Sequence, residues 1–389
     1  MSTSPIQRSE EPGVQMSTQL LRIDPLLLLA GLGLSLCSFV TLRGAGFHSY
    51  ADKQALYSVF GLLLALLVTR FDYTVLREYR YVFYGLGIVL NLAVFAFPSI
   101  KGAHSWIPLP GFQFESSEFG KLLLIVSASA FAVERSRRLS ERRTVARVML
   151  LALLPAMLVM AQSNLGTALV YVTIGCALLF FLGTGWRQLA ALALLFVVAA
   201  VIVLIAAPAV GVQLLHLYQQ QRLTTFINPT CNSNNPVCYQ LHESLIAIGS
   251  GQKTGLGAAG ATQAAYGFLP VPQSDFIFAV LGETYGFAGA AVVISLYALL
   301  IWRSLVILTM AKNLFGTLVA GGVLATFMFQ IFLNIGMTIG IMPVAGVTLP
   351  LLSYGGSSVI VTFLAIGLLE SIHVQASMAS SGKARVLIV

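Results

Sequence analysis

Charged residues are scarce in this sequence. Only 9% of the 389 residues are Asp, Glu, Lys or Arg, whereas 57% are hydrophobic. A soluble domain carries about 25% charged residues. This chain has too few charged residues to cover the surface of a soluble globule of its length. High hydrophobicity equally excludes a disordered chain. The composition therefore predicts a polytopic membrane protein.

Several chemical signatures are absent as well. The sequence has no GxxxxGK[ST] phosphate loop, no GxSxG nucleophile motif, and no Cys/His spacing typical of zinc sites. Cys37 and Cys176 lie in hydrophobic runs and are expected to be small core residues. Cys231 and Cys238, in CNSNNPVC, could form a disulfide in an oxidising exterior. Their spacing leaves that bridge open, with no redox role.

Hydrophobic runs of membrane-spanning length recur along the chain. A helix needs roughly 20 apolar residues to cross a bilayer. The runs predict an all-α domain of about ten transmembrane helices at residues 25–372, between a disordered tail at 1–24 and a second tail at 373–389. The predicted spans are Pro25–Leu42, Gln54–Thr69, Tyr81–Ile100, Ser117–Val133, Val148–Gln162, Asn164–Gly185, Gln188–Leu215, Phe276–Trp302, Asn313–Ile341 and Tyr354–Leu369.

The basic residues predict the orientation. If the N-terminus is cytoplasmic, most of the 22 Lys and Arg residues fall in inner loops, as the positive-inside rule requires. Both termini are then cytoplasmic. The basic cluster Arg135–Arg147 is interpreted as a topology anchor, and no nucleic-acid partner is expected.

The outer side carries two long polar segments. One is KGAHSWIPLPGFQFESSEFG at Lys101–Gly120, and the other is a large loop at about 216–275 between the seventh and eighth spans. The inner loops are short and basic. Because binding residues concentrate on loops held by a rigid scaffold, chemistry is expected on the outer face.

Four ionisable residues lie at the outer ends of predicted helices, where a charge usually faces water or a partner. Glu118 and Lys121 are spaced i, i+3 and can pair on one helix face. Asp275 directly precedes the eighth span, and Glu283 follows eight residues later. The Glu118–Lys121 pair is interpreted as either a structural ion pair or a functional one. Asp275 is interpreted as a helix cap or as a functional carboxylate. Glu283 is interpreted as a buried group that fixes helix packing or as a functional group.

Two glycine-rich segments add candidates. Ala247–Gln263, AIGSGQKTGLGAAGATQ, is expected to be a loop that approaches a ligand or another backbone closely. SYGGSS at Ser353–Ser358 opens the tenth span, where backbone N–H groups could bind phosphate or small residues could pack helices. The further candidates for binding substrate are Arg222, Gln240, Lys253, Ser353, Ser357 and Ser358.

These motifs together resemble the SEDS family (shape, elongation, division and sporulation) of integral-membrane peptidoglycan polymerases. The strongest matches are SDFIFAVLGE at Ser274–Glu283, AIGSG at Ala247–Gly251, FLP at Phe268–Pro270 and NIGMTIGIMPVAGVTLPLLSYGGSS at Asn334–Ser358. Weaker matches are SWI at Ser105–Ile107, SEFGK at Ser117–Lys121 and NLGTA at Asn164–Ala168. Their order along nearly the whole chain makes the resemblance specific. FQFESSEFGKLLLI is slightly closer to the rod-shape type than to the division or sporulation type.

The resemblance implies a function and a site. Family members join lipid II units into glycan strands on the outer face of the bacterial cytoplasmic membrane, beside a class B penicillin-binding protein. The family's essential Asp matches Asp275, and its Glu and Lys of the fourth helix match Glu118 and Lys121. Supporting roles are expected for Trp106, Asn164, Glu283 and Asn334.

The sequence also departs from the family pattern. Ser105 stands where Arg is usual, and Glu115-Ser116-Ser117-Glu118 replaces Gln-Pro-Ser-Glu. Asn164 replaces the usual Asp of Gln-Pro-Asp-Leu-Gly, and Thr284 the second Glu of a frequent Glu-Glu. These changes leave the role of any second carboxylate open.

The implied chemistry is the attack of a sugar hydroxyl on an anomeric carbon, with loss of a diphosphate. Asp275 is expected to be the general base, a ligand of a divalent cation such as Mg²⁺, or both. Cationic side chains would stabilise the leaving group. The alternatives are a flippase for lipid-linked precursors and a scaffold that only activates the penicillin-binding protein.

Overall fold

The computed structural model describes residues 22–98, 105–109, 112–136, 142–201, 222 and 236–386. Most of this part of the chain is helical. The helices are α2 (Pro25–Gly44), α3 (His48–Thr69), η1 (Tyr73–Arg77), α4 (Arg80–Ala93), η2 (Val94–Ala96), α5 (Ser116–Glu134), α6 (Arg142–Ala161), α7 (Leu165–Phe181), α8 (Trp186–Val201), α11 (Pro236–Gly251), α12 (Gly257–Gly260), α13 (Thr262–Ala265), α14 (Ile277–Met310), α15 (Leu314–Thr338) and α16 (Gly356–Val386), and the strands are β1 (Trp106–Leu109) and β2 (Phe112–Glu115).

The helix lengths fit a polytopic membrane protein. Among the described residues, seven helices are long and apolar enough to span a bilayer, and three shorter apolar helices cover Arg80–Ala96, Leu165–Phe181 and Trp186–Val198. An all-α membrane fold is therefore confirmed, whereas the count of ten spans stays a prediction. The second half of the predicted seventh span and Cys231 lie outside the described residues.

Helix starts follow local capping chemistry. Asp24 accepts hydrogen bonds from the backbone N–H groups of Leu26 and Leu27 at the start of α2, with Pro25 at the first helical position. Asn164 and Asn313 cap α7 and α15 in the same way. Arg303 Nε donates to Asp24 Oδ2 over 2.7 Å, which ties the start of α2 to α14.

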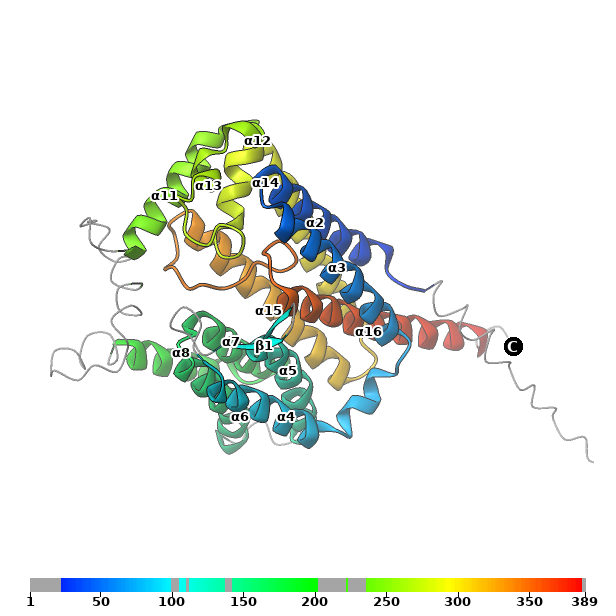
Figure 1. Ribbon diagram of the computed structural model, residues 1–389. Helices are drawn as coiled ribbons and strands as arrows, with labels where there is room; N and C mark the ends of the chain where they lie inside the picture. The colour runs from blue at the N-terminus through cyan, green and yellow to red at the C-terminus, as the bar shows by residue number, and fades with distance from the viewer. Residues whose placement is uncertain are drawn as a thin grey trace, which may run out of the picture.

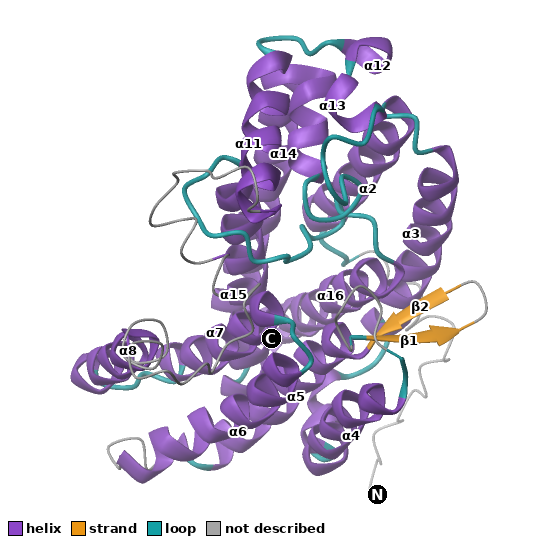
Figure 2. Cartoon of the chain, turned by 60° about the vertical axis from the view of Figure 1, so that its left-hand side comes forward, coloured by secondary structure: helices purple, strands orange, loops and turns teal. Residues whose placement is uncertain are grey.

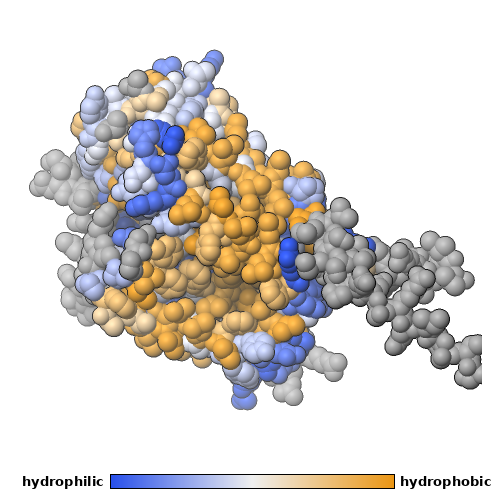
Figure 3. All heavy atoms as spheres, turned by 45° about the vertical axis from the view of Figure 1, so that its right-hand side comes forward, coloured by the Kyte–Doolittle hydropathy of each residue, from blue (hydrophilic) through white to orange (hydrophobic). Residues whose placement is uncertain are grey.

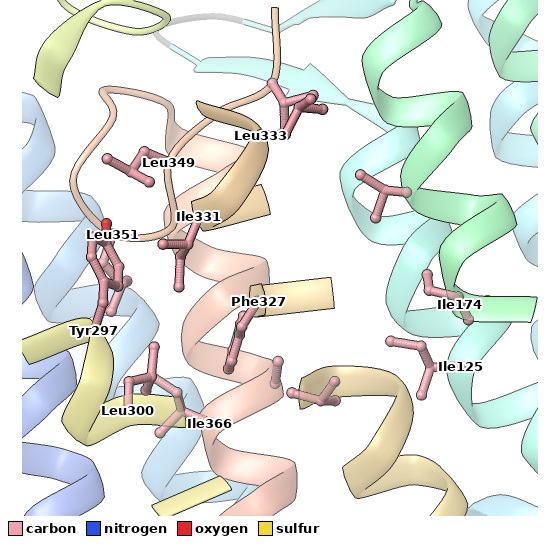
Figure 4. Close-up of a cluster of buried hydrophobic side chains, with 14 of the residues drawn as sticks. Ile125, Ile174, Tyr297, Leu300, Phe327, Ile331, Leu333, Leu349, Leu351 and Ile366 are labelled. Atoms are coloured by element: carbon pink, nitrogen blue, oxygen red, sulfur yellow. The ribbon is translucent and has the colours of Figure 1, made fainter. Parts of the chain in front are cut away.

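The bundle has two helix groups with α15 and α16 between them (Figure 1). α16 packs along α3, and α15 packs against α5, α7 and α14. Figure 4 shows the buried side chains where these groups meet, among them Tyr297, Phe327 and Leu349. Because lipid is as apolar as these side chains, it is their close van der Waals packing that helps to hold the helices together.

The exterior is apolar around the middle of the bundle. Figure 3 shows a broad hydrophobic surface with hydrophilic residues at its edges. On α3, the apolar side chains Leu56, Val59, Phe60 and Leu63 are all more than half exposed. Such an apolar girdle is what a lipid-facing surface requires.

Two sequence predictions were wrong in detail, and one polar segment has a structure that was not predicted. The glycine-rich segment is not a loop throughout, because Ala247–Gly251 completes α11, and α12 and α13 follow it. A Cβ on Gly251 would lie 1.8 Å from the Gly282 carbonyl oxygen, so these glycines serve close backbone packing against α14. The tenth predicted span, Tyr354–Leu369, is too short, because α16 runs to Val386 and its candidate membrane-spanning stretch is Gly356–Ala379. The Trp106–Glu115 segment forms an antiparallel hairpin, seen beside α16 in Figure 2.

Residues 344–353 of the connection between α15 and α16 are largely buried although they are not helical. Buried loops need partners for their backbone groups. Tyr297 donates to Pro350 O over 2.7 Å, Ser38 to Leu352 O over 2.7 Å, and Gln54 to Ser353 O over 3.1 Å. Hydrogen bonds from α14, α2 and α3 thereby fix the α15–α16 connection. The candidate functional site lies against this connection.

Candidate functional site

Asp275 lies two residues before α14 and against the α15–α16 connection. Its Oδ1 accepts a hydrogen bond from Ser274 Oγ over 2.9 Å. The N-cap residue of α14 is Phe276, with no side-chain cap. Asp275 is therefore one residue outside the N-cap position that was weighed for it from the sequence.

The side chains of Arg222 and Asp275 both lie close to Gly346. Gly346 has φ +66°, a conformation that favours glycine. A Cβ placed on it would lie 3.2 Å from Arg222 Nη1 and 3.5 Å from Asp275 Oδ2. The guanidinium of Arg222 and the carboxylate of Asp275 thus share one small space, which is open only because residue 346 has no side chain. We call Asp275, Arg222 and Gly346 the Asp275 site.

The backbone around Asp275 is held from two sides. Asn334 of α15 donates through Nδ2 to Asp275 O over 3.1 Å and to Val347 O over 2.6 Å. Ser353 donates to Ser274 O over 2.5 Å and accepts from Leu349 N over 2.8 Å. Both side chains are buried, so they position the Asp275 site rather than offer groups to a ligand.

A second polar group is centred on Glu115, the last residue of β2. Its Oε1 accepts hydrogen bonds from Ser117 Oγ over 3.1 Å and from Asn164 Nδ2 over 3.3 Å. Trp106 stands opposite Glu115 in the hairpin register, and Ser357 accepts from the Glu115 backbone N–H over 2.9 Å. The hairpin, α7 and α16 therefore fix the position of this carboxylate.

Glu118 and Lys121 form the ion pair that their spacing predicts, with 2.8 Å between Lys121 Nζ and Glu118 Oε1. Both side chains are only 4% exposed. A buried pair must offset a large desolvation cost, which requires good geometry. We call Glu115, Ser117, Glu118, Lys121 and Asn164 the Glu115 cluster.

Electrostatics connect the two groups. The pKa of Glu115, which lies just before the α5 span, is raised to about 7, chiefly because the carboxyl is buried. The negative charges of Glu118 and Asp275 contribute to this rise, whereas Lys121 and the hydrogen bond from Ser117 oppose it. Glu115 thus lies within electrostatic reach of both Asp275 and the buried ion pair.

The remaining sequence candidates lie elsewhere or are occupied by the protein itself. Ser358 Oγ is 3.1 Å from Thr348 Oγ1. Glu283 is buried and accepts hydrogen bonds from the backbone N–H groups of Gln263 and Ala264 in α13. Lys253 is exposed, and its carbonyl oxygen accepts from Ala288 N, beyond the kink of α14 at Gly286. Gln240 is half-buried in the first turns of α11. The structure does not bring Lys253 to Asp275.

A divalent cation has few ligands here. Among the described residues there is no group of three His, Cys, Asp or Glu side chains that could hold a metal ion. Mg²⁺ is commonly held by one or two carboxylates together with substrate phosphates. Asp275 could supply one such carboxylate, and the cation stays a proposal.

The chain was compared with known proteins. Residues 16–378 match the FtsW/RodA/SpoVE family, described as cell cycle proteins. This chain belongs to the FtsW/RodA/SpoVE family. It is 33% identical over 377 residues to the Escherichia coli protein named peptidoglycan glycosyltransferase MrdB, covering 96% of this chain and 99% of that one. It is 30% identical over 330 residues to stage V sporulation protein E of Bacillus subtilis, covering 83% and 86%.

Solved structures share the family fold. One, from work on the structural coordination of polymerization and crosslinking by a peptidoglycan synthase complex, superposes with a TM-score of 0.76 at 28% identity and covers 91% of this chain and 98% of that one. The rod shape determining protein RodA of Thermus thermophilus superposes with a TM-score of 0.66 at 26% identity and covers 90% and 96%. The predicted SEDS resemblance is confirmed, while rod-shape and division types are not distinguished.

Several residues that build the Asp275 site and the Glu115 cluster were not predicted from the sequence. Glu115 was noted only as a departure from the family pattern, and Gln54 and Tyr297 were not noted at all. A glutamate beside the predicted Glu118–Lys121 pair was the one available signal for Glu115. Nothing local marked Gln54 and Tyr297, because their partners lie 299 and 53 residues away along the chain.

Proposed function

We propose that this bacterial membrane protein is a peptidoglycan glycosyltransferase that polymerises lipid II into glycan strands. The observation that carries the proposal is the Asp275 carboxylate held beside the Arg222 guanidinium at Gly346. The names of the relatives and the family membership support the reaction class.

Polymerisation needs a base and a charge-stabilising group. The 4-hydroxyl of one sugar forms a bond to the anomeric carbon of the next, the bond to the polyprenyl diphosphate breaks, and the hydroxyl proton must leave. Asp275 takes this proton as general base, a role worth about 10²–10⁴ in rate. A direct displacement with a single base inverts the configuration at the anomeric carbon.

The leaving diphosphate needs cations. Arg222 is the described cation that shares the space of Asp275, and its planar fork suits phosphate oxygens. Lys121 lies in the Glu115 cluster and pairs with Glu118, so it acts over a longer range. A Mg²⁺ ion bound in part by Asp275 would supply further positive charge. Lys253 is a weaker candidate, given its place beyond the α14 kink.

The orientation follows from the charges. With both termini in the cytoplasm, the basic segment at 135–147 faces inward and Asp275 faces outward, at the surface where the glycan strand grows. The lipid tails of both substrates would lie along the apolar surface of Figure 3. The partner proposed for crosslinking is a class B penicillin-binding protein, in keeping with the synthase complex that shares this fold.

Two other functions make different predictions. A flippase would move lipid II across a proteoliposome bilayer without forming polymer. A scaffold would activate the penicillin-binding protein without using Asp275. The hydrogen bonds from Asn334 and Ser353, which fix the backbone of Asp275 and Ser274, favour a chemical role over both.

The direct test uses purified full-length protein, lipid II, and a partner penicillin-binding protein whose crosslinking serine is replaced. Glycan polymer on a gel is expected. Lipid II that crosses the bilayer in proteoliposomes while no polymer forms under any condition would support the flippase instead.

A further inference from the structure

A cavity of about 480 Å³ lies where η1 and α4 meet the end of α5 and the start of α15. Its wall includes Arg77, Glu78, Arg80 and Asn313. η1 packs against both α5 and α15, so the cavity lies at a junction of packed elements. None of the residues of this wall belongs to the Asp275 site or to the Glu115 cluster.

The cavity and Asp275 lie near opposite ends of α15. Leu314, the first residue of α15, lines the cavity, and Asn334, which donates to Asp275 O, follows 20 residues later. A helix rises 1.5 Å per residue, so about 30 Å separate these two residues along the helix axis. This distance is close to the thickness of the hydrocarbon core of a bilayer. With Asp275 facing outward, the cavity lies at the cytoplasmic boundary of the membrane.

Arg80, the first residue of α4, has a donor without an acceptor. Its Nη2 lies 3.1 Å from Glu134 Oε1, and its guanidinium lies over the rings of Tyr81 and Phe131, at 4.8 and 5.7 Å from the ring centres. Its Nε is buried and has no hydrogen-bond partner within the described residues. A buried donor that lacks an acceptor destabilises a protein. A ligand in the cavity with acceptor oxygens would remove this cost.

The charges around the cavity favour an anion. Arg77 is exposed and forms no ion pair in the part of the chain that the structure describes. Two arginines of the wall face a single glutamate, Glu78, which is exposed. Glu134, which pairs with Arg80, offsets part of the second positive charge. The start of α15 adds the positive end of a helix dipole.

Apolar and aromatic side chains adjoin the two arginines along the chain. Val75, Tyr79 and Tyr81 are each about half exposed or more. Tyrosine is enriched where the membrane meets water, and basic pockets between transmembrane helices on the cytoplasmic side bind anionic lipid headgroups. A cationic cavity beside an apolar surface suits a ligand with a charged head and hydrocarbon chains better than a free anion.

We infer that this cavity binds the phosphate headgroup of an anionic phospholipid of the cytoplasmic leaflet. Arg77 and Arg80 donate hydrogen bonds to the phosphate oxygens, and Arg80 Nε thereby gains its acceptor. The acyl chains lie against the exposed apolar side chains, Tyr79 and Tyr81 among them. The inference uses the proposed orientation only to name the leaflet, and it needs no part of the proposed reaction.

The test measures lipid binding to the purified full-length protein in detergent by native mass spectrometry. The probes are phosphatidylglycerol, phosphatidylcholine with the same acyl chains, and inorganic phosphate as a competitor. Both lipids carry a phosphodiester, but only phosphatidylglycerol has a net negative charge. The variants are Arg77→Gln, Arg80→Gln and the double variant, with Arg187→Gln, an exposed arginine at the start of α8, as matched control.

Wild-type protein is expected to bind phosphatidylglycerol about 10-fold or more tightly than phosphatidylcholine, because each arginine near a membrane surface contributes about fivefold. Arg77→Gln should weaken phosphatidylglycerol binding about fivefold, and the double variant should remove the preference. Arg187→Gln should leave it unchanged. The unfolding temperature in lipid-free detergent checks that each variant is folded. If Arg80→Gln unfolds, the exposed position of Arg77 lets Arg77→Gln decide alone.

Other outcomes overturn the inference. Equal affinity of wild type for the two lipids contradicts it, and so does an Arg77→Gln protein that binds phosphatidylglycerol as tightly as Arg187→Gln. Inorganic phosphate that displaces phosphatidylglycerol at equal concentration would assign the cavity to free phosphate instead. A wild-type protein that makes no polymer from lipid II overturns the proposed function and leaves this binding site untouched.

Discussion

Asn334 of α15 donates a hydrogen bond to the backbone carbonyl oxygen of Asp275 over 3.1 Å. The same Nδ2 donates to Val347 O over 2.6 Å, so one amide joins the start of α14 to the α15–α16 connection. The position of the proposed base is thus set by a side chain 59 residues away rather than by its own helix.

Replacing this amide should loosen Asp275. Asn334→Ala is expected to destabilise the protein by about 1–3 kcal/mol, because two carbonyl oxygens lose a buried donor. The polymerisation rate should fall by about 10-fold or more, because a small displacement of the Asp275 carboxylate from the reacting hydroxyl slows the reaction strongly. Thermal unfolding and kinetics measure the two effects. Asn313→Ala, which removes the cap of α15 far along that helix, is the control and should keep its activity; full activity in Asn334→Ala contradicts the positioning role.

Gly346 should tolerate no side chain. Gly346→Ala places a methyl group between Arg222 and Asp275 and forces alanine into a left-handed conformation, which alone costs about 1–2 kcal/mol. Gly183→Ala imposes the same backbone cost at φ +84° in open space. Both variants should show similar losses of unfolding temperature, but only Gly346→Ala should lose polymerisation. Equal activity in the two variants would show that the space beside Gly346 is not used.

Variants of the buried Glu118–Lys121 pair distinguish a role in stability from a role in the reaction. Lys121→Met alone should destabilise by about 3–5 kcal/mol, because it leaves an uncompensated buried charge. The double variant Glu118→Gln with Lys121→Met should recover most of that stability. If the pair also takes part in the reaction, the polymerisation rate of the double variant stays low although its stability is restored. Stability and activity that recover together would make the pair purely structural.

Glu115 should make stability fall with rising pH. Its pKa of about 7 in the folded protein lies above its ordinary value of 4.5, so the folded state binds the proton more tightly. Its stabilising contribution is complete below pH 4.5 and is lost as the pH rises towards 7. The unfolding temperature of Glu115→Gln relative to wild type should therefore increase over this range. A constant difference between the two proteins would show that the carboxyl titrates normally.

Much of the fold was predictable because its signals are local. Hydrophobic runs located the helices, and the i, i+3 spacing located the Glu118–Lys121 ion pair. The position of Asp275 just before α14 was equally local. Sequence alone also indicated that Ala247–Gln263 approaches something closely, and the structure shows backbone packing between Gly251 and Gly282.

The rest depended on contacts between distant segments. The strands Trp106–Leu109 and Phe112–Glu115 are only four residues each, so contacts with α16, such as that between Glu115 N and Ser357 Oγ, help to hold the hairpin in place. The part of Glu115 in the site emerges only when the hairpin, α7 and α14 come together. No local pattern specifies that arrangement.

The central claim is that the Asp275 carboxylate performs the chemistry. The measurement is lipid II polymerisation by Asp275→Asn, a nearly isosteric change that removes the base, compared with wild type at equal folded fraction. The account predicts a loss of about 10²-fold or more in rate, with binding of the penicillin-binding partner unchanged. Polymer formed by Asp275→Asn at the wild-type rate would contradict it.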